Sequence, residues 1–182
     1  MTPKDTNLIC QCGQVSLKVT GSPIVSAECL CLDCQQAGNT LQQRAGAPKI
    51  MDNKGATRFV LYRKDRVSFQ GSQHLLREYY LNDKSTTRRV VASCCNTPMF
   101  LEFTAGHWLS IYGSLWQQAS LPALDLRTMT RSRPTGVELP NDVPNPKTHN
   151  LSFMVKLLTA WIAMGFRSPK LSFINEKLDT NS

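Results

Sequence analysis

Seven cysteines, gathered into three short groups, constrain this chain more than any other feature of its sequence. The groups read Cys10-Gln11-Cys12-Gly13, Cys29-Leu30-Cys31-Leu32-Asp33-Cys34 and Cys94-Cys95. A closed set of disulfides cannot use up an odd number of cysteines, and the first residues lack the apolar segment of a secretory signal. We therefore expect a cytoplasmic protein whose cysteines bind a metal or act as reactive thiols, as they do in reducing compartments.

The spacing within the groups favours zinc over a reactive thiol or redox pair. In an extended segment, residues i and i+2 point to the same face, so a Cys-x-Cys pair offers two sulfurs to one ion. Cys29, Cys31 and Cys34 supply three ligands within six residues, which leaves one position of a tetrahedral zinc open. An open position is typical of a catalytic zinc.

The remaining cysteines predict a second, structural zinc. Cys10 and Cys12 need distant partners, and the only other cysteines are Cys94 and Cys95. A zinc held by these residues would join an early hairpin to a late strand. We expect two zinc ions per chain, and no role as ligand for the three histidines, which are His74, His107 and His149.

Hydrophobic periodicity predicts a mainly β protein. Val15, Leu17 and Val19 alternate with polar residues, as in a half-buried strand. Further strand-like runs begin at Ile24 and cover residues 58–62, 66–70, 74–80, 87–93, 99–103 and 108–112. Many short strands separated by turn residues indicate antiparallel sheets.

The C-terminal third differs in composition. Residues 116–133 carry no clear pattern, and four prolines exclude a helix between residues 134 and 149. Residues 151–165 predict a helix with Asn150 as its N-cap. We divide the chain into a zinc-binding β domain (8–115), an irregular extension (116–149), the helix region (150–166) and a tail (167–182).

The predicted helix is apolar over most of its circumference, so it must be covered on several sides. Docking against the sheet is the main interpretation, and a homodimer interface through residues 150–166 is the second. A helix lying in a membrane surface is disfavoured because its polar stripe holds one lysine, Lys156. No apolar run reaches the length of a membrane span.

The order of the cysteine groups resembles the glutathione-dependent formaldehyde-activating enzyme family, which includes centromere protein V. Similar features are Ala37-Gly38 after the middle group, Arg66 to Gly71, and Thr87-Arg88-Arg89 before the last group. The resemblance, over residues 8–112, implies a β-tent of antiparallel sheets with two zinc sites. It implies structural ligands at Cys10, Cys12 and Cys95, and active-site ligands at Cys29, Cys31 and Cys34, where glutathione would react.

The last group departs from the family pattern, CxxCG, because Ala92 stands where its first cysteine belongs. Cys94 lies beside Cys95, and adjacent residues of a strand point to opposite faces. Our hypothesis is that the chain bends here, so that Cys94 supplies the fourth structural ligand.

The function implied is that of a zinc-dependent carbon–sulfur lyase acting on an adduct of an aldehyde with glutathione or another thiol. Candidate partners for substrate carboxylates are Arg44, Lys49, Arg63 and Arg88. For Asp33, capping the turn between Cys31 and Cys34 is favoured over the alternative, an acid–base group beside the metal. The first alternative is a non-catalytic scaffold stabilised by zinc.

The second alternative is a nucleic-acid-binding module, suggested by a net charge of +8. It would use the basic clusters Arg58/Arg63/Lys64/Arg66, Arg88/Arg89 and Arg127/Arg131/Arg133. Scattered charges on strands are usually solvated, and seven thiolates with two zinc ions would lower the net charge by three. Nucleic acid is therefore the less favoured partner.

Overall fold

A computed structural model describes residues 5–179 and contains two β-sheets and two α-helices. The small sheet consists of β1 (Thr6–Ile9), β2 (Val15–Val19) and β5 (Val67–Gly71), in the order β1-β2-β5. The large sheet has the order β10-β3-β4-β9-β8-β7-β6. Its strands are β3 (Val25–Cys29), β4 (Thr57–Arg63), β6 (Leu76–Tyr79), β7 (Thr87–Ala92), β8 (Thr97–Phe103), β9 (Trp108–Tyr112) and β10 (Leu126–Thr128).

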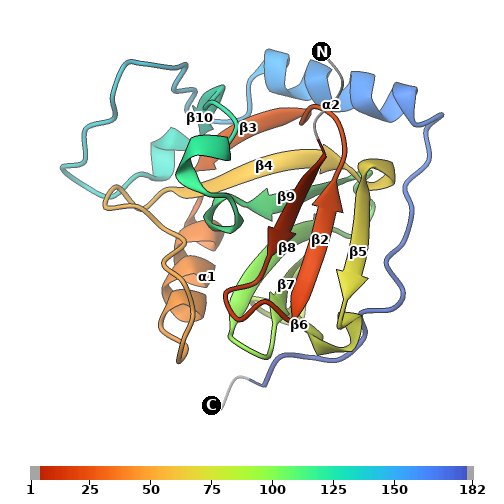
Figure 1. Cartoon of the computed structure of the whole chain (residues 1–182). Coiled ribbons are helices and arrows are strands. Elements are labelled where there is room, and N and C mark those ends of the chain that lie inside the picture. The colour runs from red at the N-terminus through yellow and green to blue at the C-terminus, as the bar shows by residue number, and fades with distance from the viewer. Residues whose placement is uncertain (1–4, 180–182) are drawn as a thin grey trace.

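The helices are α1 (Leu32–Gln42) and α2 (Leu151–Ala163), and Figure 1 shows them beside the sheets. Single 3₁₀ turns lie at Lys64–Arg66, Gln73–Leu75, Gly113–Leu115, Gln118–Ser120 and Thr130–Ser132. The prediction of a mainly β fold with a C-terminal helix is confirmed. The strands pair antiparallel except for β10, which pairs parallel with β3.

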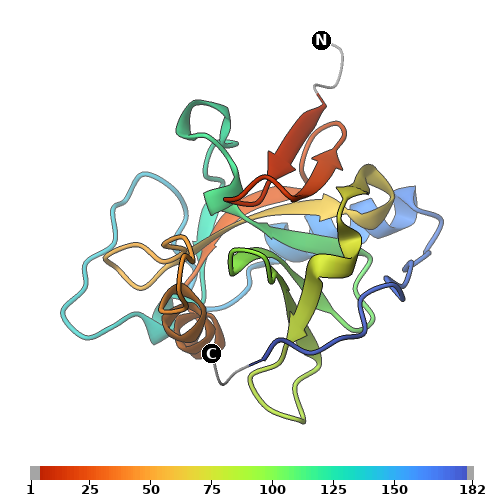
Figure 2. The ribbon, with the colours of Figure 1, turned by 60° about the horizontal axis from the view of Figure 1, so that its bottom comes forward.

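The large sheet is buried on both faces. Val60, Phe100 and Ile111 belong to one core cluster, which they share with Leu8 and Leu17 of the small sheet. Figure 2 shows the β1–β2 hairpin standing on that side of the large sheet. Strands buried on both faces have nearly continuous apolar sequences, which explains the long apolar runs of β4, β8 and β9.

The opposite face of the large sheet carries both helices. Phe59, Leu61 and Leu101 form a second core cluster with Leu41 of α1 and Phe153 of α2. Successive residues of a strand point to opposite faces, so Phe59 and Leu61 lie on this side while Val60 lies on the other. This second face is the one that bears the candidate site.

Helix α2 begins and docks as the sequence predicts. The Asn150 side chain accepts a hydrogen bond of 2.8 Å from the Phe153 amide, and Gly165 has a φ of +61° just after the helix. Phe153, Leu157 and Ala160 are buried. The outward face stays apolar, with exposed Leu151, Met154, Val155, Leu158 and Ile162.

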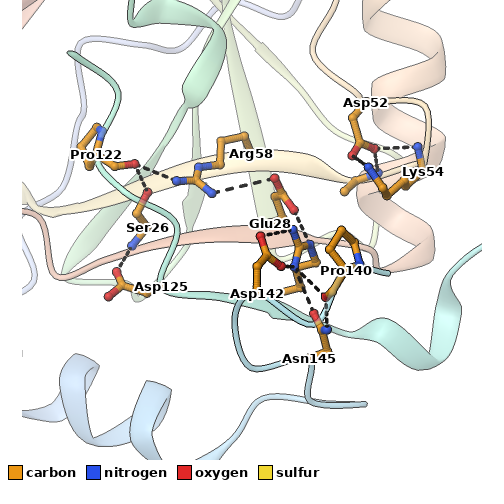
Figure 3. A network of polar contacts seen from close by, with 12 residues as sticks. Ser26, Glu28, Asp52, Lys54, Arg58, Pro122, Asp125, Pro140, Asp142 and Asn145 are labelled. Carbon is orange, nitrogen blue, oxygen red and sulfur yellow. Dashed lines mark hydrogen bonds and ion pairs between the residues drawn. The ribbon is translucent and has the colours of Figure 1, made fainter. Parts of the chain in front are cut away.

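A polar network ties the segment after β9 to strand β3 (Figure 3). Arg127 forms ion pairs with Glu28 at 2.7 Å and with Asp142 at 2.6 Å. The Ser26 amide donates to Asp125 at 2.8 Å. These contacts hold β10 against β3. No helix lies between residues 134 and 149, as the prolines predict.

The chain after α2 runs along the edge of the large sheet, on the right of Figure 1. The Glu78 amide donates to the Glu176 carbonyl at 2.9 Å, and the Leu178 amide donates to the Glu78 carbonyl at 2.8 Å. Arg88 also donates to the carbonyls of Leu171 and Ile174. These bonds attach the C-terminal segment to β6 and β7.

Lys64 and Glu102 form a buried ion pair of 2.5 Å, with side chains 2% and 6% exposed, and Arg88 also contacts Glu102. We expect Glu102→Gln to lower the free energy of unfolding by about 3–5 kcal/mol, because Lys64 then remains buried without an anionic partner. Urea unfolding measures the effect. The control, Glu176→Gln, breaks an ion pair whose carboxylate side chain is 66% exposed and should lower stability by less than about 1 kcal/mol. Equal effects of the two changes would contradict the prediction.

Candidate metal centres and an adjoining cavity

Cys10, Cys12, Cys94 and Cys95 converge from two turns, one between β1 and β2 and one between β7 and β8. The Sγ–Sγ distances are 3.6 Å for Cys10–Cys12, 3.3 Å for Cys12–Cys94, 3.9 Å for Cys10–Cys94 and 3.8 Å for Cys94–Cys95. A tetrahedral zinc with Zn–S bonds of about 2.3 Å holds its sulfurs about 3.8 Å apart. The geometry and the soft donors therefore fit one zinc ion.

A bend in the chain lets Cys94 and Cys95 face the same point. The Cys95 amide donates to the Ala92 carbonyl at 3.3 Å, and Asn96 has a φ of +53°. Asparagine adopts positive φ more readily than most residues, so Asn96 can fill a position where glycine is usual. This is the bend that the sequence hypothesis requires.

Neighbouring groups stabilise sulfur as thiolate in this cluster. Burial opposes ionisation of Cys95, but hydrogen bonds from the Thr97 hydroxyl and the Cys12 backbone lower the pKa of its thiol to about 6. The pKa of Cys94 is raised, mainly by burial. The Val15 amide donates to the Cys10 sulfur at 3.3 Å. The cluster therefore contains one thiol that ionises readily and others that a cation would have to deprotonate.

Cys29, Cys31 and Cys34 form the second group, where β3 ends and α1 begins. Their sulfurs all lie within 4.8 Å of one another. Cys31 is the N-cap of α1 and accepts a hydrogen bond of 3.4 Å from the Cys34 amide. Within the described residues, no other Cys, His, Asp or Glu joins this group.

The three thiols do not ionise alike. Hydrogen bonds from the Cys29 and Cys34 thiols and the Cys34 amide lower the pKa of Cys31 to about 2. The hydrogen bond that it donates to Cys31 raises the pKa of Cys29 to about 12, and hydrogen bonds to Cys29 and Cys31 together with burial raise that of Cys34. The group thus has one anionic sulfur at a helix N-terminus and two thiols that a bound cation would deprotonate. Three thiolate donors suit a zinc with one open position.

The sequence predicted a capped turn between Cys31 and Cys34, but the structure has helix α1 there. Cys31, not Asp33, caps the helix. Gly38 lets the helix pack closely, because a Cβ there would lie 2.4 Å from the Met51 sulfur.

A cavity of about 410 Å³ adjoins the three-cysteine group. This volume falls within the range of small-molecule sites. Its wall includes eight large apolar side chains, namely Phe59, Leu61, Leu101, Phe103, Trp108, Phe153, Met154 and Leu157. Phe103 and Met154 are also exposed, so the cavity opens to solvent beside them.

His149 contributes to the wall of this cavity, a position that no sequence pattern predicted. Its Nδ1 contacts the Thr128 hydroxyl at 3.0 Å, and its ring stacks on Phe153 with centroids 5.0 Å apart. Partial burial lowers the pKa of His149, while the nearby Cys31 sulfur raises it. His149 is therefore a neutral base near pH 7 that faces the cavity.

The basic residues expected to bind carboxylates lie elsewhere. Arg44, Lys49, Arg63 and Arg88 do not line the cavity. Arg88 is paired with Glu102 and Glu78, and Arg63 with Asp65. The arginine in the wall is Arg89 of β7, which in the sequence belongs to a basic cluster and to the Thr87-Arg88-Arg89 motif but was not expected at the site.

Comparison with known proteins adds a family assignment. The family model described as "Glutathione-dependent formaldehyde-activating enzyme" matches residues 6–115. The chain belongs to the glutathione-dependent formaldehyde-activating enzyme family. No curated protein matches the chain. A crystal structure of a Rhodobacter sphaeroides protein is similar at 13% identity and a TM-score of 0.45, covering 78% of this chain and 100% of that one.

The segment shared with the formaldehyde-activating family holds all seven cysteines and Arg89. It does not hold β10, His149 or α2, which supply part of the cavity wall. The cavity therefore combines a cysteine group from the segment that the family model matches with walls from the C-terminal third. No helix within residues 5–179 is both long and apolar enough to cross a membrane.

Proposed function

We propose that the chain forms or cleaves the carbon–sulfur bond of a thiol–aldehyde adduct, with glutathione and formaldehyde as the first pair to test. The supporting observation is the contrast between its two cysteine groups. Four sulfurs complete one group, whereas the other has three and adjoins a cavity of about 410 Å³. A complete ligand set is typical of a structural zinc and an open one of a catalytic zinc.

Zinc is the metal expected in both groups, with Cys10, Cys12, Cys94 and Cys95 holding the structural ion. Cys29, Cys31 and Cys34 would hold the other. When bound by three thiolates, zinc supplies an open position where an added thiol ionises at neutral pH.

The remaining chemistry falls to the chain's own residues. In adduct formation the thiol loses its proton, its sulfur bonds to the carbonyl carbon, and the carbonyl oxygen gains a proton. His149, neutral and facing the cavity, is placed to accept the first proton and return one to the oxygen. The apolar wall limits the water that competes for the aldehyde.

The experiment is a zinc measurement followed by a rate measurement. Protein purified without chelator should contain two zinc ions per chain and should accelerate the consumption of formaldehyde by glutathione. Failure of the zinc-loaded protein with glutathione, 2-mercaptoethanol and an apolar thiol such as 1-octanethiol would overturn the proposal and favour a zinc-stabilised scaffold. Disulfides in place of zinc would favour redox chemistry.

His149→Gln should slow adduct formation by about 100-fold, the lower limit of the usual contribution of a general acid–base. Zinc content should not change, because His149 is outside the cysteine group. His74→Gln is the control, since His74 is exposed and does not line the cavity. An unchanged rate in His149→Gln would remove His149 from the mechanism.

The nucleic-acid alternative gains little support from the arrangement of charges. Arg58, Lys64, Arg88 and Arg127 all have carboxylate partners, and Arg89 is buried. Paired and buried cations contribute little to a surface that tracks phosphates.

A further inference from the structure

Arg89 is a buried cation without a carboxylate partner, and its charge acts on the nearby Cys31 sulfur. The residue is 1% exposed and lines the cavity from β7. Its Nη2 donates to the backbone carbonyl of Asp33 at 3.1 Å. Its guanidinium also interacts with the Tyr112 hydroxyl. Its Nε and Nη1 make no hydrogen bond of good geometry within residues 5–179, and no carboxylate in this range pairs with it.

The other buried Lys and Arg side chains among residues 5–179 are paired. Lys64 contacts Glu102, and Arg127 contacts Glu28. Arg88, next to Arg89 in the same strand, contacts both Glu102 and Glu78. Burying N–H donors without acceptors is costly, so the two unsatisfied nitrogens of an arginine in a cavity indicate that an acceptor comes from outside the chain.

A second donor in the same wall also lacks an acceptor. The Trp108 indole N–H is buried and has no hydrogen-bond partner among the described residues. Arg89 and Trp108 can only donate hydrogen bonds, so a ligand that satisfies them must supply acceptor atoms. An anionic group with several oxygens supplies the acceptors and makes the charge-assisted hydrogen bonds that arginine favours.

The position of Arg89 relates this anionic group to the sulfur chemistry. Arg89 holds the carbonyl of Asp33, and Asp33 lies between Cys31 and Cys34 in the sequence. An anion on Arg89 therefore lies close to the three-cysteine group. A ligand that reaches both must carry its anionic group near its sulfur.

The rest of the wall limits what else the ligand can carry. Arg89 is the only Lys or Arg among the described residues that line the cavity, and eight large side chains there are apolar. Glutathione brings two carboxylates, an ammonium group and two amides, more polar groups than this wall can satisfy. A ligand with one anionic group and an apolar body matches the wall better.

We propose that the cavity takes a thiol with an apolar body and one carboxylate near the sulfur, or the aldehyde adduct of such a thiol, and that Arg89 binds the carboxylate. This inference rests on the proposed function for the reaction at the sulfur. The carboxylate site itself does not depend on that reaction.

The test compares 2-mercaptooctanoate with its methyl ester, which has the same sulfur and apolar tail without the charge. Calorimetric titration of the zinc-loaded protein should show that the acid binds at least about tenfold more tightly, the effect of one charge-assisted hydrogen bond. Arg89→Met should bind the two alike. Arg131→Met, which removes an exposed charge outside the cavity, should keep the preference.

Two further measurements separate this inference from the proposed function and from a purely structural role. Octanoate has no thiol, so Arg89-dependent binding of octanoate to metal-free protein supports the anion site even if no reaction is found. Metal-free Arg89→Met should unfold at the same temperature as the wild type or higher, because two buried N–H donors without acceptors are removed. Arg89→Lys retains the charge and should retain part of the preference for the acid.

Three results would overturn the inference. The first is equal binding of acid and ester by the wild-type protein, a result that does not depend on any variant folding. The second is a preference for the acid that persists in Arg89→Met. The third combines two observations: Arg89→Met loses zinc from the three-cysteine group, and the wild type shows no preference for the acid. This result would mean that Arg89 serves only to balance the charge of the metal site.

Discussion

Cys31→Ser is expected to reduce the zinc content from two ions to one and to lower the rate of adduct formation by more than about 100-fold. Even outer partners of metal ligands commonly cost 10–100-fold when they are replaced, and Cys31 is a proposed ligand. Serine keeps a hydroxyl that can cap α1 in place of the sulfur. The loss should therefore come from the metal and not from the fold.

The measurements are zinc content, reaction rate and urea unfolding of metal-free protein. Metal-free Cys31→Ser and wild type should unfold within about 1 kcal/mol of each other, because serine is a good N-cap. Asp33→Asn serves as a control, since Asp33 lies between two proposed ligands without joining their group. Two zinc ions in Cys31→Ser would contradict the ligand assignment, and one ion with an unchanged rate would contradict the catalytic role.

Cys94→Ser is expected to lower mainly the free energy of unfolding, in contrast to Cys31→Ser, which is expected to lower mainly the reaction rate. The Cys94 sulfur lies 3.3 Å from that of Cys12 and 3.9 Å from that of Cys10, inside the proposed structural cluster. Structural zinc sites contribute apparent binding energies of about 10–16 kcal/mol in small zinc-binding peptides. Losing one of four ligands should remove at least about 3 kcal/mol of this contribution, as the larger single mutations do.

Unfolding with and without chelator tests this prediction. Chelator should destabilise the wild type strongly and Cys94→Ser much less, because the variant has already lost its structural ion. The ion of the three-cysteine group should remain, so the variant should retain one zinc before chelation. A variant with two zinc ions and wild-type stability would show that Cys94 is not a ligand, despite the absence of a cysteine at position 92.

The strands could be predicted because their signal is local. Alternation at Val15, Leu17 and Val19 and the apolar runs from residue 58 onward gave β2 to β9 within about two residues at most ends. His74 was an exception, since it lies in a 3₁₀ turn before β6. The two cysteine groups could be predicted because sulfur spacing restricts which residues can share an ion.

Other elements gave weak signals. Helix α1 buries only one face, through Cys34, Ala37, Gly38 and Leu41, and two of these side chains are too small to mark a helical period. Strand β10 has three residues and is held by distant partners such as Glu28. Strand β1 was not recognised either, since its four residues include one buried side chain, Leu8.

The cavity could not be predicted, because it depends on contacts between distant segments. Arg89 resembles its neighbour Arg88 in the sequence, and only the fold separates a paired arginine from an unpaired one. His149 belongs to a proline-rich segment and reaches the wall through Thr128 and Phe153.

The sequence distance between the cysteines of each group has a consequence for the order in which the two groups bind metal. Cys29, Cys31 and Cys34 span six residues, so closing this loop costs less than about 2 kcal/mol in chain entropy. Cys10 and Cys94 are 84 positions apart, which raises this term to about 4 kcal/mol. A growing chain can therefore load the first group as soon as residue 34 is free. The second cysteine group can bind its ion only after the two sheets have packed together. That ion therefore stabilises a fold that has already formed.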